Sequence, residues 1–309
     1  MKTNYIRQLI LPLIAAGIWG TSFVFQSDST AYVEPFTFTA LRSAVGSLFL
    51  VLVLLVRRVL RRRTATAVQA RPVTNWRVLL LSGFVCGTVL TAATNLQQFG
   101  MREGTSAGKA AFITALYVVL VPVVGFLLFR KKQSPAIWVS VVIAVAGLYF
   151  LCVNGTESLA KGDIFVMLCA LAFTAHILVI DHFGPHVDGI ALSCVQFAVV
   201  ALWSTLGMLA FETPSWESIV LCTVPILYVG VLSSGIAYTL QIIAQKGTNS
   251  TVVALLLCLE SVFATLAAVL MRGQWLNERE TVGSVLMLLA VVLAQIPSAA
   301  WLRSRKHKK

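Results

Sequence analysis

The chain has 309 residues, of which 58% are hydrophobic and only 12% are charged. A soluble domain of this length carries about a quarter charged residues, and apolar segments of about 20 residues recur down the whole sequence, which excludes a separate aqueous domain. The net charge of +12 lies mainly in the connections between these segments, so we expect a membrane topology signal and no nucleic-acid partner.

Ten membrane-spanning helices are predicted, so the expected fold is an all-α polytopic membrane protein. The predicted spans are 9–27, 36–56, 77–99, 105–129, 135–153, 163–181, 190–211, 217–242, 250–271 and 281–302. The first span follows Lys2 and Arg7 as a signal peptide would, but it is too long for one and no cleavage motif follows it.

Basic residues gather in alternate connections, for example in the run Arg57–Arg63 and at Arg130–Lys132. Placing the N-terminus in the cytoplasm puts most Lys and Arg inside and most acidic residues outside. We therefore expect a multi-pass protein of the cytoplasmic membrane with both termini cytoplasmic. The Arg57–Arg63 run would either hold anionic lipid or act only as a topological anchor.

The two halves of the chain resemble each other weakly. At an offset of 144, six residues of the first half meet identical residues in the second: Ala93, Leu96, Gln97, Ser106, Ala110 and Val118. The earlier helices align at an offset of 154, where Trp19 meets Phe173. Since each half contains five predicted spans, an odd number, we predict inverted repeats over 1–153 and 154–309, the second ending in a basic cytoplasmic tail.

Polar residues line one face of several predicted spans. The faces are Thr88, Thr91, Asn95 and Gln98 on the third helix, Ser234, Tyr238, Gln241 and Gln245 on the eighth, and Trp19, Ser22, Phe23 and Gln26 on the first. Hydrocarbon cannot satisfy such groups, so they must face protein or a wet cavity. Hydrogen bonding that only holds the bundle together is the alternative.

Ionisable residues and one proline also fall within or at the ends of spans. Arg42 would clamp a carboxylate or phosphate, or else satisfy helix ends, and Lys109 would capture an anion or extend to the membrane surface. Glu260, mid-way along the ninth helix, costs at least about 2.5 kcal/mol unless it is paired or protonated. It would carry protons, bind an amine, or pair with Arg42 or Lys109. His176 would relay protons or make an ordinary polar contact, and Pro122 is a candidate hinge.

We expect neither a cofactor nor a metal, because the chain lacks phosphate-loop, HExxH and Cys/His metal-ligand spacings. Ser233 and Ser234 with His176 only faintly suggest a protease dyad, and no catalytic motif surrounds them, so an enzyme is not expected. A channel-like facilitator and a membrane signalling or scaffold protein would have a similar composition. No filter-like sequence or ring of charges favours a channel.

Several short motifs follow one another in a fixed order. They are Trp19-Gly20-Thr21-Ser22-Phe23, Pro35 through Ala40-Leu41-Arg42, the run from Ala110 to Pro122, Gly147-Leu148-Tyr149, and Leu259-Glu260-Ser261-Val262-Phe263-Ala264. From about Pro12 to Trp301 the chain thereby resembles the EamA type of the drug/metabolite transporter superfamily. The Gly-Glu pair that often closes the fourth and ninth helices there is Phe129-Arg130 and Gly273-Gln274 here, so no role of those glutamates carries over.

The resemblance implies a secondary carrier or exporter of small organic metabolites, such as amino acids or amines, that works by alternating access. The candidate cavity residues are Trp19, Ser22, Arg42, Thr91, Asn95, Gln98, Lys109, Tyr117, His176, Ser234, Tyr238, Gln241 and Glu260. Glu260 is the candidate coupling residue, with protons as the coupling ion, and the partners are a small-molecule substrate and membrane lipid. Aromatic faces with one acid favour an amine, Arg42 and Lys109 favour a carboxylate, and a zwitterion satisfies both.

Overall fold

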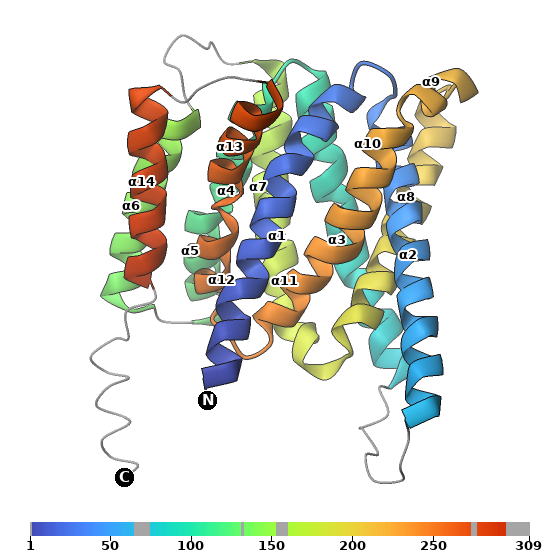
Figure 1. Cartoon of the computed structure of the whole chain (residues 1–309), viewed down its shortest axis with the longest axis horizontal. Helices are drawn as coiled ribbons and strands as arrows, with labels where there is room; N and C mark the ends of the chain where they lie inside the picture. The colour runs from blue at the N-terminus through green and yellow to red at the C-terminus, as the bar shows by residue number, and fades with distance from the viewer. Residues whose placement is uncertain (1, 65–74, 131–132, 153–159, 273–276, 295–309) are drawn as a thin grey trace.

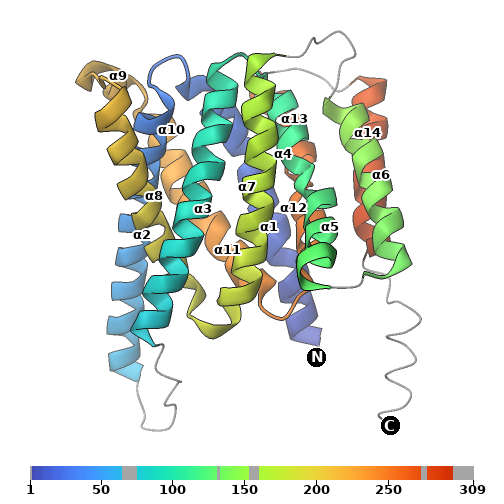
Figure 2. The same cartoon turned by 180° about the vertical axis from the view of Figure 1, so that it is seen from behind.

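All regular structure in the described residues of this computed structural model is helical. The structure describes residues 2–64, 75–130, 133–152, 160–272 and 277–294. The helices stand side by side in one bundle, seen from the front and from behind (Figure 1, Figure 2). We call the end at which the chain begins, lower in both views, the lower end, and the opposite end the upper end.

The chain passes back and forth between the two ends (Figure 1). The first half contains α1 (Lys2–Ser29), α2 (Pro35–Thr64), α3 (Trp76–Arg102), α4 (Ala107–Ala115), α5 (Tyr117–Phe129) and α6 (Pro135–Cys152). The second contains α7 (Lys161–Phe183), the 3-10 turn η1 (Gly184–His186), α8 (Gly189–Phe211), α9 (Trp216–Leu221), α10 (Thr223–Tyr228), the π-helix η2 (Val229–Ala237), α11 (Tyr238–Gln245), α12 (Ser250–Leu257), α13 (Glu260–Arg272) and α14 (Glu278–Ala294).

Within the described residues, eight helical segments are long and apolar enough to cross a membrane. They are Gln8–Ser29, Pro35–Leu60, Trp76–Arg102, Ala107–Phe129, Lys161–His186, Gly189–Phe211, Thr223–Gln245 and Ser250–Ala267. Large apolar side chains such as Leu127, Leu128 and Leu209 are exposed on the outside of the bundle, as lipid contact requires. The prediction of an all-helical, multi-span membrane protein is confirmed.

Two predicted spans are not among these eight. The span 135–153 corresponds to α6, whose apolar part Pro135–Phe150 is shorter than the others. The span 281–302 begins within α14, which starts three residues earlier and carries Glu278 and Glu280 in its first turn. The end of that span and the basic tail lie at 295–309, outside the described residues, so the number ten stays a prediction.

Three spans predicted as continuous helices are interrupted. The span 105–129 breaks at Leu116, whose N–H bonds only three residues back to Ile113, and 250–271 breaks at Cys258–Leu259, where the Leu259 N–H bonds three residues back to Leu256. Such tight bonds end one α-helix and let the next begin at a new angle. The span 217–242 passes through η2, where the Tyr238 N–H bonds to the Ser233 carbonyl five residues back. Continuous and interrupted helices have the same hydrophobic pattern. The sequence therefore did not reveal the two breaks or the π-helix.

Helices α2 and α8 form an antiparallel pair that carboxylates fasten at both ends. At the upper end, Glu212 follows α8 and accepts hydrogen bonds of 2.7 Å from the backbone N–H groups of Phe36 and Thr37, in the first turn of α2. At the lower end, Asp188 caps the first turn of α8 and pairs with Arg57 of α2 at 2.9 Å. A negative charge at a helix N-terminus is favourable, so both contacts stabilise the pair.

Glycines allow the closest helix crossings. A Cβ added at Gly46 of α2 would lie 2.7 Å from the Ser234 Cβ and 2.8 Å from the Gly230 carbonyl oxygen, both in η2. A Cβ added at Gly147 of α6 would lie 2.9 Å from the Gly283 carbonyl oxygen of α14. Helices in lipid associate through such close packing because the hydrophobic effect does not drive them together.

The variant Gly46→Ala should therefore force α2 and η2 apart. We expect the free energy of unfolding in detergent micelles to fall by about 1–3 kcal/mol, the usual cost of overpacking. Gly108→Ala is the matched control, since a Cβ there meets nothing within 4 Å. Equal losses in the two variants would contradict a close crossing at Gly46.

The Asp188 cap should make stability depend on pH. Partial burial raises the pKa of Asp188, but hydrogen bonds from the Ala191 N–H and from Arg57 lower it more, and the pKa lies below its usual value. Its charge therefore stabilises the fold fully above the unfolded pKa of about 3.9, and this stabilisation is lost as the pH falls through the lower folded pKa.

Asp188→Asn keeps a capping side chain and loses only the charge. It should be less stable than the wild type by up to about 1 kcal/mol at neutral pH, because the ion pair is partly exposed. The melting temperatures of the two proteins, followed as the pH is lowered, should converge in acid. A gap that stays constant below the folded pKa would refute the charge effect.

Candidate functional site

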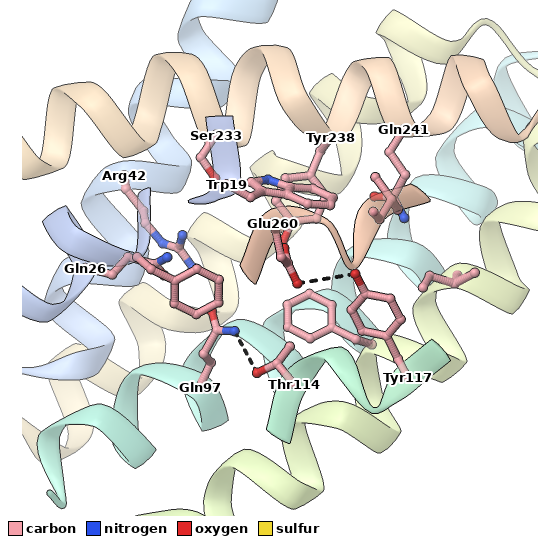
Figure 3. A pocket seen from close by; sticks show the side chains of 14 residues that line it. Trp19, Gln26, Arg42, Gln97, Thr114, Tyr117, Ser233, Tyr238, Gln241 and Glu260 are labelled. Atoms are coloured by element: carbon pink, nitrogen blue, oxygen red, sulfur yellow. Dashed lines mark hydrogen bonds between the residues drawn. The ribbon is translucent and has the colours of Figure 1, made fainter. Parts of the chain in front are cut away.

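A buried cavity lies in the middle of the bundle, where segments of both halves of the chain meet (Figure 3). Its lining residues are Trp19, Phe23, Gln26, Arg42, Gln97, Thr114, Tyr117, Phe173, Ile177, Ser233, Tyr238, Gln241, Leu257 and Glu260. The free space is about 40 Å³, whereas pockets for small molecules usually measure about 300–1,000 Å³. In this conformation the cavity has room for water, and a metabolite would require the lining side chains to move.

Glu260 supplies the acidic group of the cavity. It is only 4% exposed, and the Tyr117 hydroxyl donates a 3.2 Å hydrogen bond to its Oε1 atom. Glu260 is also the first residue of α13, directly after the break at Cys258–Leu259. The break therefore creates a helix N-terminus at the position of the carboxylate, and such an end favours negative charge.

Arg42 supplies the basic group. Its side chain reaches from α2 into the cavity and the residue is 2% exposed (Figure 3). The guanidinium lies 5.5 Å from the centre of the Phe38 ring, and its Nε atom has no hydrogen-bond partner. In the part of the chain that the structure describes, neither Arg42 nor Lys109 forms an ion pair with Glu260. The predicted structural pairing of Glu260 with a basic residue is thus not what the geometry shows.

Aromatic and amide side chains complete the cavity. Trp19 and Tyr238 meet edge to face with ring centres 4.7 Å apart, and the indole Nε1 atom has no partner. Gln97 donates a 3.1 Å hydrogen bond to Thr114 across the wall (Figure 3). The Gln241 Oε1 atom is also buried without a partner. Unpartnered polar atoms around one cavity are typical of a site that binds water or a ligand.

The structure brings only part of the predicted site together. Trp19, Arg42, Tyr117, Tyr238, Gln241 and Glu260 all line the cavity. Seven other predicted residues do not, namely Ser22, Thr91, Asn95, Gln98, Lys109, His176 and Ser234. Most of these make hydrogen bonds or packing contacts between and within helices, as the alternative interpretation of the polar faces anticipated.

The predicted face of α3 points away from the cavity. Asn95 donates a 2.9 Å hydrogen bond to Ser204 of α8, and Thr91 donates to a carbonyl of its own helix. Gln98 donates to the Gln26 carbonyl and to Ser29 of α1, at the upper end. The cavity side of α3 is instead the position of Gln97, one residue away and therefore about 100° around the helix.

The remaining four residues lie behind the cavity wall or near its upper end. Ser22 donates to the Ile18 carbonyl, and His176 contacts Gln196 at 3.2 Å, with its ring 6.0 Å from that of Tyr238. Ser234 packs against Gly46 of α2. Lys109 forms a 2.7 Å ion pair with Asp163, a residue that the sequence analysis did not single out.

Several cavity residues were missing from the list of candidate cavity residues, and the repeat contained a signal for some of them. Gln97 is the repeat counterpart of Gln241, and Phe173 is the counterpart of Trp19. Ile177 aligns with Phe23 at the same offset of 154, and both line the cavity. Thr114, Leu257 and Ser233 carried no such signal.

Ser233 replaces Ser234 in the cavity because of the π-helix. In an α-helix Ser234 and Tyr238 share a face, four residues apart. In η2 the hydrogen bonds span five residues, so Ser233 is the residue stacked under Tyr238. The wider turn rotates Ser234 towards α2.

Comparison with known proteins finds a family model that matches both halves of the chain. The model of the EamA-like transporter family matches residues 7–153 and 160–295. An uncharacterized transporter of Archaeoglobus fulgidus is 28% identical over 313 residues, which cover 96% of this chain and 92% of the relative. The uncharacterized transporter YwfM of Bacillus subtilis is 24% identical over 304 residues, with coverage of 95% and 94%. A crystal structure with 18% identity matches 94% of this chain and 98% of its own with a TM-score of 0.73, which shows a common fold.

The Lys109–Asp163 pair provides a test of the structural role of Lys109. Asp163 is buried and also accepts hydrogen bonds from Thr105 and from the Ala160 backbone. Lys109→Met should lower the unfolding free energy by about 3 kcal/mol, because it removes the counter-ion of the buried Asp163 carboxylate, and Asp163→Asn should lower it by less, because the Lys109 side chain is 14% exposed. The double variant should lose clearly less than the sum of the two. Additive losses in a double-mutant cycle would show that the two residues do not stabilise each other.

Proposed function

Because this chain belongs to the EamA-like transporter family and is a membrane transporter, we propose that it is a secondary carrier of small organic metabolites such as amino acids or amines. The carrier would work by alternating access around the central cavity. The observation that carries this proposal is the cavity itself, where Arg42 and Glu260 are buried from different helices without pairing. Unpaired charged groups are costly inside a membrane, and proteins usually keep them there only where a function requires them.

The contacts between helices support two inverted repeats over 1–153 and 154–309. Helix α1 runs from the lower end to the upper end, whereas α7, its counterpart, runs from the upper end to the lower (Figure 1). α1 packs on α13 and on η2 and α11, and α7 correspondingly packs on α4, α5 and α3. α2 pairs with α8, and α6 pairs with α14, as counterparts across a two-fold axis would. The cavity then lies between the repeats, as in many secondary carriers.

The broken helices provide a means of movement. α4 and α5 separate at Leu116, and α12 and α13 separate at Cys258–Leu259, so both breaks flank the cavity in corresponding spans. Discontinuous helices that meet near the membrane midplane are common in carriers. Pro122 lies inside α5, six residues after the first break, and its role as a hinge stays a prediction.

The charge distribution supports cytoplasmic termini in a cytoplasmic membrane. Of the described residues, Arg57, Arg77, Arg130 and Lys246 lie at the lower end, where α1 begins. The upper end carries Asp28, Glu34, Glu103, Asp163, Glu212, Glu217, Glu278 and Glu280. By the positive-inside rule the lower end faces the cytoplasm.

Glu260 is the proposed coupling residue. A carboxyl group in the cavity can take up a proton or meet a cationic group of the substrate, and both use the same oxygen atoms. Competition between proton and substrate at one carboxylate would couple their movements. The Tyr117 hydroxyl then holds the carboxylate in place while it is charged.

Reconstituted protein in sealed vesicles tests the carrier. Wild type should concentrate a labelled amino acid or amine against its gradient when a pH gradient is imposed. Glu260→Gln should abolish this uphill transport and spare exchange, because the amide cannot carry a proton. Glu278→Gln, a change at an exposed position on α14, is the matched control and should transport normally. Uphill transport by Glu260→Gln would refute the coupling role, and single-channel currents would indicate a pore in place of a carrier.

A further inference from the structure

We propose that Arg42 is the carboxylate-binding residue of the cavity, so that the transported solute carries a carboxylate beside its amino group. This inference rests on the proposed carrier function and narrows its substrate from amines or amino acids to amino acids and related zwitterions. The basis is the geometry of Arg42, Trp19 and Glu260 around one cavity.

First, the Arg42 guanidinium is buried and lacks a protein counter-ion among the described residues. The group is buried with the residue only 2% exposed, its Nε atom has no hydrogen-bond partner, and within the described chain it forms no ion pair. The guanidinium carbon lies 5.5 Å from the centre of the Phe38 ring. A guanidinium offers five donors in a planar fork that fits a carboxylate with two parallel hydrogen bonds. A buried arginine that only held the bundle together would have used these donors on protein acceptors.

The second step is the neighbourhood of Arg42. The Trp19 indole Nε1, a pure donor, is also buried without a partner and belongs to the same cavity. Figure 3 shows the indole ring between Arg42 and Tyr238. The cavity also has two unpartnered acceptors, Gln26 Oε1 and Gln241 Oε1, which can take an ammonium group, whereas the two donors fit an anionic or strongly accepting ligand group. An alkylamine has no such group and would leave both donors unsatisfied.

The third step is the relation of Arg42 to Glu260. Both line the cavity, yet they lie beyond ion-pair distance of each other. In Figure 3, Glu260 is held on the side of Tyr117, and Arg42 lies on the side of Gln26 and Gln97. A ligand with an ammonium group near Glu260 and a carboxylate near Arg42 compensates both charges at once. An uncompensated buried charge is strongly destabilising, so a ligand that meets both charges would bind favourably.

Matched ligand sets test the carboxylate directly on the wild-type protein. The sets are L-phenylalanine, L-phenylalaninamide and phenethylamine, and L-leucine, L-leucinamide and isoamylamine, each titrated in a thermal-shift assay on the purified full-length chain. We expect the amino acid of at least one set to raise the melting temperature, and its amide and amine to have at least about tenfold weaker effects. A charged hydrogen-bonding pair accounts for that ratio. Sodium chloride is a separate arm that tests an inorganic anion at Arg42.

Variants locate the effect at Arg42. Arg42→Gln should weaken amino-acid binding by about 10- to 100-fold. Arg42→Lys keeps the charge and loses the forked guanidinium, so its amino-acid affinity should fall between those of the wild type and Arg42→Gln. It also provides a test if Arg42→Gln does not fold. Arg77→Gln, at the exposed start of α3, is the control and should bind as the wild type does.

The inference fails if the amide or amine binds as well as the amino acid, if no amino acid binds, or if chloride alone gives the Arg42-dependent shift. An amine that binds equally and is taken up by vesicles would overturn the carboxylate site and leave the carrier proposal standing. If the protein binds an amino acid through Arg42 but moves no solute in vesicles, the carboxylate site stands and the carrier proposal is overturned.

Discussion

The physical constraint on which this structure depends is the cost of placing charge inside a membrane. Glu260 and Arg42 are both buried at the centre of the bundle, where they line the cavity and are shielded from bulk water. Glu260 begins helix α13, and its carboxylate accepts a hydrogen bond from the Tyr117 hydroxyl. Within the described residues no acidic side chain pairs with Arg42. The charge of Arg42 is therefore left for a ligand to compensate.

The surrounding bundle separates rigid parts from movable ones. α2 and α8 are fastened at both ends, by Glu212 above and by Asp188 with Arg57 below. Close contacts between small residues hold α6 to α14 and α2 to η2. The spans α4–α5 and α12–α13 are each broken into two helices. Tyr117 begins α5 and Glu260 begins α13, so each residue directly follows a break. Tyr117 and Glu260, the groups expected to respond to ligand, therefore lie where a helix is interrupted.

The candidate residues that stand out chemically in the sequence are among those that line the cavity. Glu260 and Arg42 were found because any charge in an apolar segment is conspicuous, and both line the cavity. Polar faces were less reliable, since Asn95 hydrogen-bonds to a neighbouring helix as readily as a cavity residue would bind ligand. Lys109 was assigned to the site because its partner Asp163, at the start of another span, could not be recognised before the helices were packed.

The sequence by itself determined that the chain is a helical membrane protein, because hydrophobicity and charge placement act locally and along one dimension. It also determined which residues were too costly to leave in lipid. Only the tertiary structure decided which way each helix turns its faces, because breaks at Leu116 and Cys258–Leu259 and the π-helix at Val229–Ala237 rotate side chains without changing composition. The choice of Ser233 over Ser234 depends on the π-helix, whereas the choice of Gln97 over Gln98 depends on which side of the unbroken helix α3 packs towards the cavity.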